Sequence, residues 1–316
     1  MARSQPAGSV RPRWRRQLAC CDSCRVAEPA PAQPRAALPA RVALALIIAV
    51  VRGLGPLRRP LAGLIGALWY ASLAPEARRR VARNHRRLHP QLRARTAEAL
   101  ARASFREYVA MILDSIWAEP LSIARIRGRI RIRGLDHLEA GNDGAVVAVS
   151  HFGNWDMAAS GARALGRQVS TVMAPIGSRL VTSMVEVSRA RKGFELFAPQ
   201  QAARGLARAL RRRRLVAVMV DVPEAGPTVT VQFCGGPVRV SAVPARLAAA
   251  AGKPIIPVAC WRQRPGWVMQ FYPPITAAGA SDAETMGRIA AVLEPEIRRH
   301  PDQWYPFHDV YDDAAG

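Results

Sequence analysis

A histidine and a carboxylate with the spacing His-x4-Asp follow an apolar segment. Residues 146–149 are apolar and of β-strand character, His151 comes one residue after Ser150, and Asp156 follows a Gly-Asn turn. The end of a buried strand holds a side chain rigidly, as a general base requires. Asp156, at or near the start of the next helix, can fold back to hold the imidazole in one tautomer and to stabilise its charged form. The segment therefore predicts proton transfer by His151, with Asp156 as its positioning group.

The context of this spacing distinguishes it from a chance match. The same spacing recurs at His308 and Asp313, but in a polar tail with no strand before it, and we interpret that pair as accidental. The first pair has a strand, a turn and a following helical pattern rich in Ala and Met. The alternative interpretation of His151 is a turn histidine whose hydrogen bonds are satisfied within the fold.

The cysteines do not suggest a disulfide framework or a metal site. There are five, an odd number, and three of them are crowded near the N-terminus: Cys20, Cys21, Cys24, Cys234 and Cys260. The Cys-x2-Cys spacing of Cys21 and Cys24 is half a zinc site at best, since no second Cys/His pair lies at a suitable distance. We expect free thiols, no structural metal and no cofactor.

The positive charge is concentrated in the N-terminal part of the chain. The formal net charge is +23, and residues 1–133 carry 26 arginines against 7 acidic residues. Such a surface needs anionic partners: phospholipid headgroups, nucleic acid or an acidic carrier protein. Recognisable nucleic-acid modules and aromatic stacking platforms are lacking, so we expect no nucleic-acid partner. Anionic membrane lipid is the expected partner of this charge.

Two short apolar segments lie beside the charge concentration. Residues 1–40 are rich in Pro, Ala, Arg and Ser and predict a disordered basic leader, with an overlong start-codon assignment as the alternative. Residues 42–51 and 61–74 are largely apolar, with arginines between them. Neither reaches the roughly 20 residues that a membrane-spanning helix needs. We predict that 41–75 associates with a membrane by insertion into one leaflet. The alternative is a pair of core helices of a soluble domain.

Beyond residue 75 the pattern predicts one catalytic domain, residues 76–313. Helical spacing extends from 76 to 117, with a break expected at Pro90, and 125–133 alternates Ile and Arg like a half-exposed strand. Strands are then expected over 146–150, 169–173, 194–197, 215–220, 229–233, 255–260 and 268–271. Helices are expected over 155–165, 180–191, 200–213, 242–251 and 284–299. This alternation predicts an α/β fold in which a central sheet is flanked by helices on both faces.

An ordered series of segments resembles one family of enzymes. His-x4-Asp at a strand end is a signature of glycerolipid acyltransferases. From about Leu44 to Tyr311 the chain resembles the lipid A biosynthesis (lauroyl/myristoyl) acyltransferase family, which includes the phosphatidylinositol mannoside acyltransferases. The segments that carry the resemblance are RRRVARNHRRLHP (78–90), SHFGNWD (150–156), VSRARKGFELF (187–197), VMVDVP (218–223), the long block 231–258 and HPDQWY (300–305). The resemblance implies a glycerolipid acyltransferase-like mixed sheet with an apolar N-terminal anchor.

The resemblance also implies a reaction and a location. A fatty acyl chain would move from acyl-carrier protein or acyl-CoA to a hydroxyl of a glycolipid, at the cytoplasmic face of the inner membrane. The residues agree with this chemistry, because a sugar hydroxyl is a poor nucleophile near neutral pH and His151 could remove its proton. The sequence has no G-x-S-x-G nucleophile elbow. We therefore expect direct transfer without an acyl-enzyme.

Four further residues are candidates for binding the substrates. A tetrahedral intermediate needs hydrogen-bond donors for its oxyanion, and Asn154, Arg189 and the backbone N–H groups of the turn are candidates. Arg191 belongs to the same basic block as Arg189. Asp221 ends an apolar strand, where α/β sheets collect ligands, and could position a sugar hydroxyl or a basic side chain. The alternatives are a surface arginine at 189 and a structural turn at 221.

The chain departs from the family pattern at three places, and these leave the acceptor open. Pro223 and Thr230 stand where many relatives carry acidic residues, and His308 is followed by Asp and Val rather than by a basic segment. A lipid A precursor and a phosphatidylinositol mannoside are both compatible with the sequence. Two other classes of function remain: a non-catalytic basic protein that binds membranes, and a lipid hydrolase that uses the same dyad on water.

Overall fold

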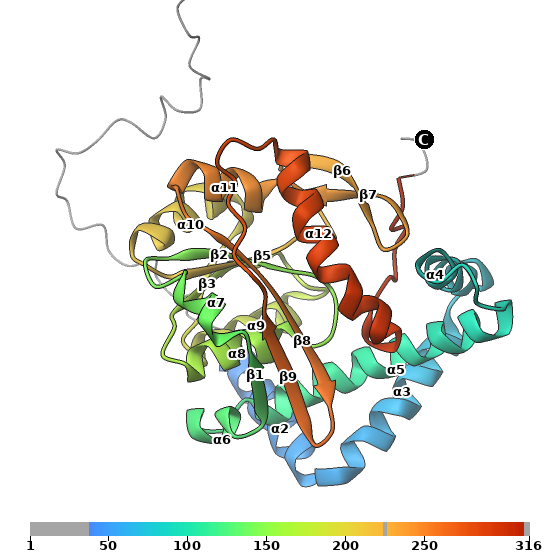
Figure 1. Ribbon diagram of the computed structural model, residues 1–316. Coiled ribbons are helices and arrows are strands. Elements are labelled where there is room, and N and C mark those ends of the chain that lie inside the picture. Colours follow the sequence, from blue (N-terminus) through green and yellow to red (C-terminus); the bar gives the residue numbers. More distant parts are fainter. Residues whose placement is uncertain (1–37, 224–225, 313–316) are drawn as a thin grey trace, which may run out of the picture. The chain divides into compact units, whose positions relative to one another are not determined.

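The computed structural model describes residues 38–223 and 226–312, which belong to one compact unit, Ala36–Gly316. The predicted leader therefore lies outside the described residues up to position 37, as do Cys20, Cys21, Cys24 and Asp313. A seven-stranded sheet forms the centre of the unit, in the order β1-β9-β8-β2-β5-β3-β4 (Figure 1). Its strands are β1 (Ile130–Arg133), β2 (Ala145–Val149), β3 (Val169–Val172), β4 (Glu195–Phe197), β5 (Leu215–Met219), β8 (Ile255–Gln263) and β9 (Gly266–Phe271). All neighbouring strands are parallel except the β8–β9 hairpin, so the sheet is mixed.

Helices cover both faces of the sheet because its strands are apolar on both sides. In β2 every residue is buried: Val146 and Ala148 contribute to one core cluster, Val147 and Val149 to the other. The first cluster is closed by α10 (Ala202–Arg211), α11 (Val243–Ala251), α12 (Asp282–Arg299) and the hairpin of β6 (Thr228–Phe233) and β7 (Gly236–Ser241). The second is closed by α6 (Ile123–Arg127), α7 (Leu135–Glu139), α8 (Trp155–Ala164) and the end of α5 (Ala94–Ala118). The predicted fold class, an α/β fold with a central mixed sheet, is confirmed.

The described elements depart from the expected ones in several places. The strand β7 and the short helix α7 were not expected. The expected strand over 125–133 begins only at Ile130, because Ser122 starts the helix α6: its Oγ accepts a hydrogen bond from the backbone N–H of Arg125 at 3.4 Å. The strand expected over 229–233 forms, but as part of the separate β6–β7 hairpin rather than of the central sheet. The break expected at Pro90 is present, since α4 (Pro75–Leu88) ends two residues before it.

The two apolar N-terminal segments are helices, α2 (Leu38–Gly53) and α3 (Arg58–Ser72), joined by the short η1 (Gly55–Leu57). Helix α3 packs closely on α5: a Cβ on Gly66 would overlap the backbone of Arg106, so glycine is required there. At the start of α3, Arg58 and Arg59 both pair with the buried Asp114 of α5. These contacts fix α3 against α5.

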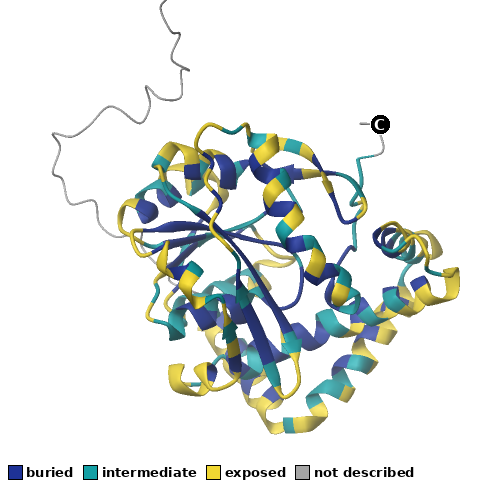
Figure 2. Ribbon diagram, in the orientation of Figure 1, coloured by how far each residue is buried: buried dark blue, intermediate teal, exposed yellow. Residues whose placement is uncertain are grey.

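Much of the apolar surface of α2 and α3 is nevertheless exposed (Figure 2). The exposed large side chains on these helices are Leu38, Val42, Leu46, Ile47 and Val50 on α2, and Leu64, Ile65, Leu68 and Trp69 on α3. Among the described helices, none is by itself long and apolar enough to cross a bilayer. The segments Leu38–Gly53 and Gly55–Ser72, bent by 103° to each other, reach the required length and composition only as a pair.

Candidate active site

His151 lies immediately beyond the carboxyl end of β2. Its turn is fixed by close packing against β8 and by two backbone hydrogen bonds. Gly153 has a positive φ of 63°, and a Cβ there would overlap the carbonyl oxygen of Cys260, so only glycine fits. The N–H of Gly153 donates to the carbonyl of Gln303 at 2.8 Å, and the N–H of Asn154 donates to Cys260 at 2.6 Å. The backbone beneath the histidine is therefore rigid, as a general base requires.

The carboxylate against the imidazole is that of Asp221. Its Oδ1 lies 2.9 Å from His151 Nδ1, and its Oδ2 accepts a hydrogen bond from the backbone N–H of His151 at 2.7 Å. Asp221 is 7% exposed, whereas the imidazole is 32% exposed. This two-point contact fixes the ring orientation and favours the tautomer with the proton on Nδ1, in which Nε2 is the basic nitrogen. From the sequence, Asp221 was expected to position either a sugar hydroxyl or a basic side chain. The contact with His151 corresponds to the second of these roles.

This arrangement corrects the expectation that Asp156 orients the imidazole. Asp156 lies in the first turn of α8 and pairs with Arg189 of α9 (Arg179–Arg191), Oδ1 to Nε, at 3.1 Å. Burial opposes ionisation of Asp156, but Arg189 and Lys192 outweigh it and lower the pKa of the carboxyl. The first turn of α8 directs this side chain toward α9, while the parallel neighbour β5 delivers Asp221 to the histidine.

Asn154 and Arg191 are also placed differently from the expectation. The Oδ1 of Asn154 accepts from the N–H of Met157 at 2.8 Å and so caps α8, while its Nδ2 donates to the carbonyl of Met111 at 3.4 Å. Its amide therefore bonds the first turn of α8 and the helix α5 rather than being offered to an oxyanion. Arg191 pairs with Glu119 at the end of α5, at 3.2 Å, instead of joining His151.

The segment after α12 contributes contacts that the sequence analysis did not predict. Trp304 forms an isolated β-bridge with Phe152, and the N–H of Tyr305 donates to the carbonyl of His151 at 3.2 Å. The hydroxyl of Tyr305 donates to the carbonyl of Gly153 at 3.0 Å. This strap, residues 304–308, lies along the histidine turn. The HPDQWY resemblance was the sequence signal that could have placed it there.

His308 at the end of the strap is a second imidazole near the site. Burial lowers its pKa, the charge of Asp221 acts against that shift, and His151 adds to it. The residue was not placed in the site from the sequence; His308 was interpreted as half of an accidental spacing, whose partner Asp313 lies outside the described residues, and as a departure from the family pattern. His308 is near His151 and Asp221 because the strap runs past them. The spacing of neighbouring residues in the sequence does not predict this course of the chain.

The chemistry of this site is that of a positioned base. Over residues 38–223 and 226–312, no group of three or more His, Cys, Asp and Glu side chains is arranged to hold a metal ion. The expectation of metal-free and cofactor-free chemistry stays a prediction. A half-exposed imidazole with a carboxylate on Nδ1 can take a proton from a hydroxyl or from water at Nε2.

Removing Arg189 is expected to destabilise the fold. The variant Arg189→Met leaves the Asp156 carboxylate with Lys192 alone, at a cost of roughly 2 kcal/mol of unfolding free energy at neutral pH. Because the folded pKa of Asp156 is lowered, the contribution of the pair is complete above the ordinary pKa of 3.8 and fades as the pH falls through the folded value. Urea unfolding at neutral and acidic pH measures both effects.

Arg246→Met is the matched control for that measurement. Its side chain is 58% exposed and that of its partner Asp282 is 29% exposed, so this surface pair should contribute less than about 1 kcal/mol. Equal losses of stability in the two variants would contradict the importance assigned to the Asp156–Arg189 pair.

Comparison with known proteins places these features in context. The model of the bacterial lipid A biosynthesis acyltransferase family matches residues 32–311. A phosphatidylinositol mannoside acyltransferase of Mycobacterium tuberculosis is 31% identical over 190 residues, which cover 58% of this chain and 60% of the relative. That of Mycolicibacterium smegmatis is 27% identical over 213 residues, covering 65% and 70%. The matched part thus spans less than two thirds of the length of the M. tuberculosis relative.

Solved structures were also found to be similar, and one of them is an acyltransferase. The 1-acyl-sn-glycerophosphate acyltransferase of Thermotoga maritima superposes with a TM-score of 0.39 at 10% sequence identity, covering 84% of this chain and 99% of that one.

Proposed function

Because the chain belongs to the bacterial lipid A biosynthesis acyltransferase family, we propose that it moves a fatty acyl chain from a thioester donor to a hydroxyl of a glycolipid. The observation that supports this most directly is the pairing of His151 with Asp221 in the rigid turn after β2. The donor is acyl-carrier protein or acyl-CoA. The names of the M. tuberculosis and M. smegmatis relatives favour a phosphatidylinositol mannoside over a lipid A precursor as the acceptor.

In the proposed reaction His151 acts as the general base. Its Nε2 takes the proton of the acceptor hydroxyl while the oxygen attacks the carbonyl carbon of the thioester. The carbon–oxygen bond forms, the carbon–sulfur bond breaks, and the departing thiolate takes the proton back from the imidazolium. Asp221 stabilises the imidazolium between these two steps. No covalent enzyme intermediate is needed.

The oxyanion of the tetrahedral intermediate needs a positive environment. Of the donors considered in the sequence analysis, Asn154 is used as a helix cap and Arg189 pairs with Asp156. The backbone N–H groups at the amino end of α8 remain, and α8 follows the His151 turn directly. The dipole of this ten-residue helix favours negative charge at that end. We assign the oxyanion to this position.

The test of the reaction is an acyl-labelling assay. Membranes containing the protein would be incubated with labelled acyl-CoA and, separately, with labelled acyl-carrier protein. We expect label to enter a glycolipid whose mass identifies the acceptor. Label recovered only as free fatty acid, at the same rate with and without glycolipid, would indicate a hydrolase instead. Membranes lacking the protein provide the control.

We also propose that the protein works at the cytoplasmic face of the inner membrane, with α2 and α3 inserted into one leaflet. The exposed apolar side chains of these helices and the arginine-rich N-terminal part support this location. Replacing four of them by serine, at Leu46, Val50, Leu64 and Leu68, should lower partitioning into lipid vesicles by at least about 100-fold. Sedimentation with vesicles measures it.

The matched control carries four serines at exposed apolar positions elsewhere: Ile123, Leu135, Ile176 and Leu180. We expect it to partition like the wild type, which would show that the loss is specific to α2 and α3. In cell membranes, extraction of the wild-type protein should require detergent. Complete release by high salt would contradict insertion and would indicate a purely electrostatic association.

A further inference from the structure

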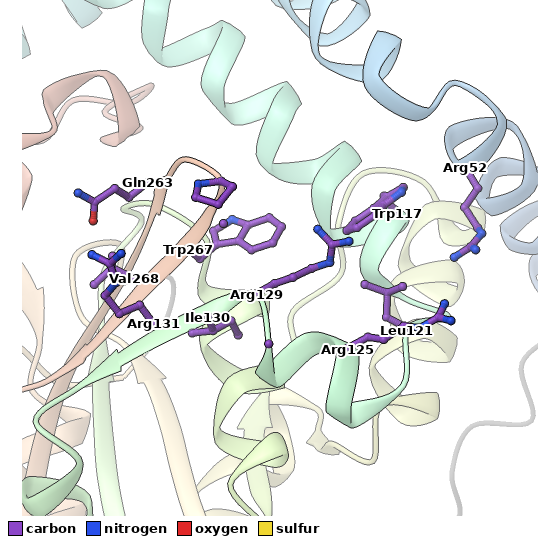
Figure 3. A pocket seen from close by; sticks show the side chains of 13 residues that line it. Arg52, Trp117, Leu121, Arg125, Arg129, Ile130, Arg131, Gln263, Trp267 and Val268 are labelled. Atoms are coloured by element: carbon purple, nitrogen blue, oxygen red, sulfur yellow. The ribbon is translucent and has the colours of Figure 1, made fainter.

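A cavity of about 670 Å³ lies apart from His151 and has not been assigned a role above. It is formed between the end of α5, α6, the start of β1 and the tip of the β8–β9 hairpin, with one side chain from the end of α2 (Figure 3). Six of its lining residues define its character: Arg52, Arg125, Arg129, Arg131, Trp117 and Trp267. Figure 3 shows Arg129 reaching toward Trp117, with Arg52 entering from α2.

The cavity is lined by positively charged arginines and by no acidic side chain that would neutralise them. None of the lining residues is acidic. Arg52, Arg125, Arg129 and Arg131 are all exposed, and the described part of the chain offers them no carboxylate within salt-bridge distance. By contrast, the neighbouring Arg58 is neutralised by Asp114, and Arg262 in the hairpin by Glu107. Among the described residues, these four guanidinium groups around one hollow thus have no carboxylate to pair with and can receive an anion.

The arginine at the centre of the cavity is held in place. The Arg129 guanidinium lies 4.7 Å from the centre of the Trp117 ring, and Arg58 lies 4.5 Å from the same centre. Arg58 is in turn fixed by Asp114. A guanidinium that is already oriented loses less conformational freedom when it binds, and its planar fork matches the oxygens of a phosphate group.

The position of the cavity indicates where that phosphate comes from. Arg52 lies in the last turn of α2, close to the exposed apolar residues Leu46, Ile47 and Val50 of the same helix. A lipid whose acyl chains lie along this surface would bring its headgroup to the level of Arg52. We propose that the cavity binds the phosphate group of an anionic lipid. That the lipid comes from a membrane rests on the proposed membrane association. The binding of its phosphate group to the cavity does not depend on whether the protein transfers acyl chains.

The cavity lies at the same end of the sheet as the catalytic turn. Ile130 lies in the cavity wall and pairs with Trp267 of β9, which pairs with Arg262 of β8. Strand β8 in turn lies beside β2, the strand that leads to His151. From strand spacing and rise, Ile130 is about 15–20 Å from His151. A lipid phosphate held there would anchor an amphiphile near the site without touching the reacting atoms. A phosphorylated glycolipid acceptor and a bulk phospholipid share this chemistry.

The test uses a soluble short-chain lipid, so that adsorption to a bilayer does not contribute. Dihexanoyl phosphatidylglycerol, below its micelle-forming concentration, would be titrated into the full-length protein by calorimetry. The variant Arg52→Gln/Arg125→Gln/Arg131→Gln keeps the Arg129–Trp117 contact, and we expect its affinity to fall about tenfold or more. The control Arg204→Gln/Arg211→Gln/Arg239→Gln removes three exposed arginines elsewhere and should bind like the wild type. Unchanged thermal melting shows that the variants are folded.

The outcomes separate the possible ligands. Phosphatidylglycerol bound more tightly than inorganic phosphate, with loss only in the cavity variant, supports the proposal. If inorganic phosphate binds as tightly as the lipid, the cavity is a phosphate site and the claim that it recognises a lipid is overturned. Coenzyme A bound through the same arginines, with no lipid binding, would assign the cavity to the acyl donor instead. Equal affinities of the cavity variant and the control overturn the site altogether.

The two lipid sources are distinguished by acyl transfer with the same variants. If the cavity holds the acceptor, KM for the glycolipid rises in the cavity variant while kcat is kept. If it holds a bulk phospholipid, KM for the glycolipid stays the same once the enzyme is bound to the membrane. Absence of transfer in the wild type would contradict the proposed function but would leave the calorimetric result standing.

Discussion

Replacing His151 by alanine should lower the rate of acyl transfer by about 10²–10⁴-fold, the range expected for loss of a general base. The imidazole is held by Asp221 through Nδ1, so its removal eliminates the group that takes the hydroxyl proton. Stability should change little, because the side chain is 32% exposed. The labelling assay described above, run with matched amounts of folded protein, measures the effect.

His137→Ala is the control for this experiment. His137 is similarly exposed, at 29%, and lies in α7 beside Asp136. Full activity in this variant, with loss in His151→Ala, would exclude a general requirement for surface histidines. Retention of wild-type rates in His151→Ala would remove this residue as the base.

Asp221→Asn is expected to lower transfer by about 10²–10⁴-fold while leaving the shape of the site intact. An asparagine at this position can accept from the backbone N–H of His151 through its oxygen, but its amide nitrogen then faces Nδ1 as a donor. The imidazole would have to carry its proton on Nε2, the nitrogen that must be free to take one from the acceptor hydroxyl. The variant therefore blocks the base by fixing the wrong tautomer.

Asp156→Asn distinguishes the two carboxylates. It weakens the contact with Arg189 but leaves the Asp221–His151 contact intact, so its effect should fall mainly on stability. Comparing kcat at equal concentrations of folded protein separates activity from folding. A large loss of kcat in Asp156→Asn together with an active Asp221→Asn would reverse the assignment made from the structure.

The sequence pointed to His151 but not to the carboxylate that contacts it, because only residues close together in the chain were compared. His151 was recognisable because strand, turn and helix follow one another within a dozen residues. The Asp221 contact spans 70 positions and depends on β5 lying beside β2, which the pattern of strands does not reveal. Asp156 was the nearest carboxylate in sequence, but the turn of α8 carries it to Arg189.

The fold was predictable to a different degree in different parts of the chain. The strands β2 and β5 are apolar runs that alternate with helical patterns, so their existence and the α/β class followed from this alternation. The helix α6 was missed because the alternation of Ile and Arg continues through it, and a single capping serine, Ser122, outweighs that alternation. The strap (residues 304–308) has no periodic pattern, and its position depends on tertiary contacts. Its place could therefore not be predicted from local spacing.

The contacts of the strap with the histidine turn also have a consequence for synthesis. The hydroxyl of Tyr305 and its acceptor on Gly153 are 152 positions apart in the chain. At ordinary rates of translation, about 10–30 s pass between the emergence of the two. During that interval the turn that carries His151 lacks the bridge to Trp304 and both hydrogen bonds to Tyr305. With α2 and α3 inserting as proposed, a nascent chain would therefore meet lipid before its His151 turn is anchored, so that arrival at the membrane would precede competence for chemistry.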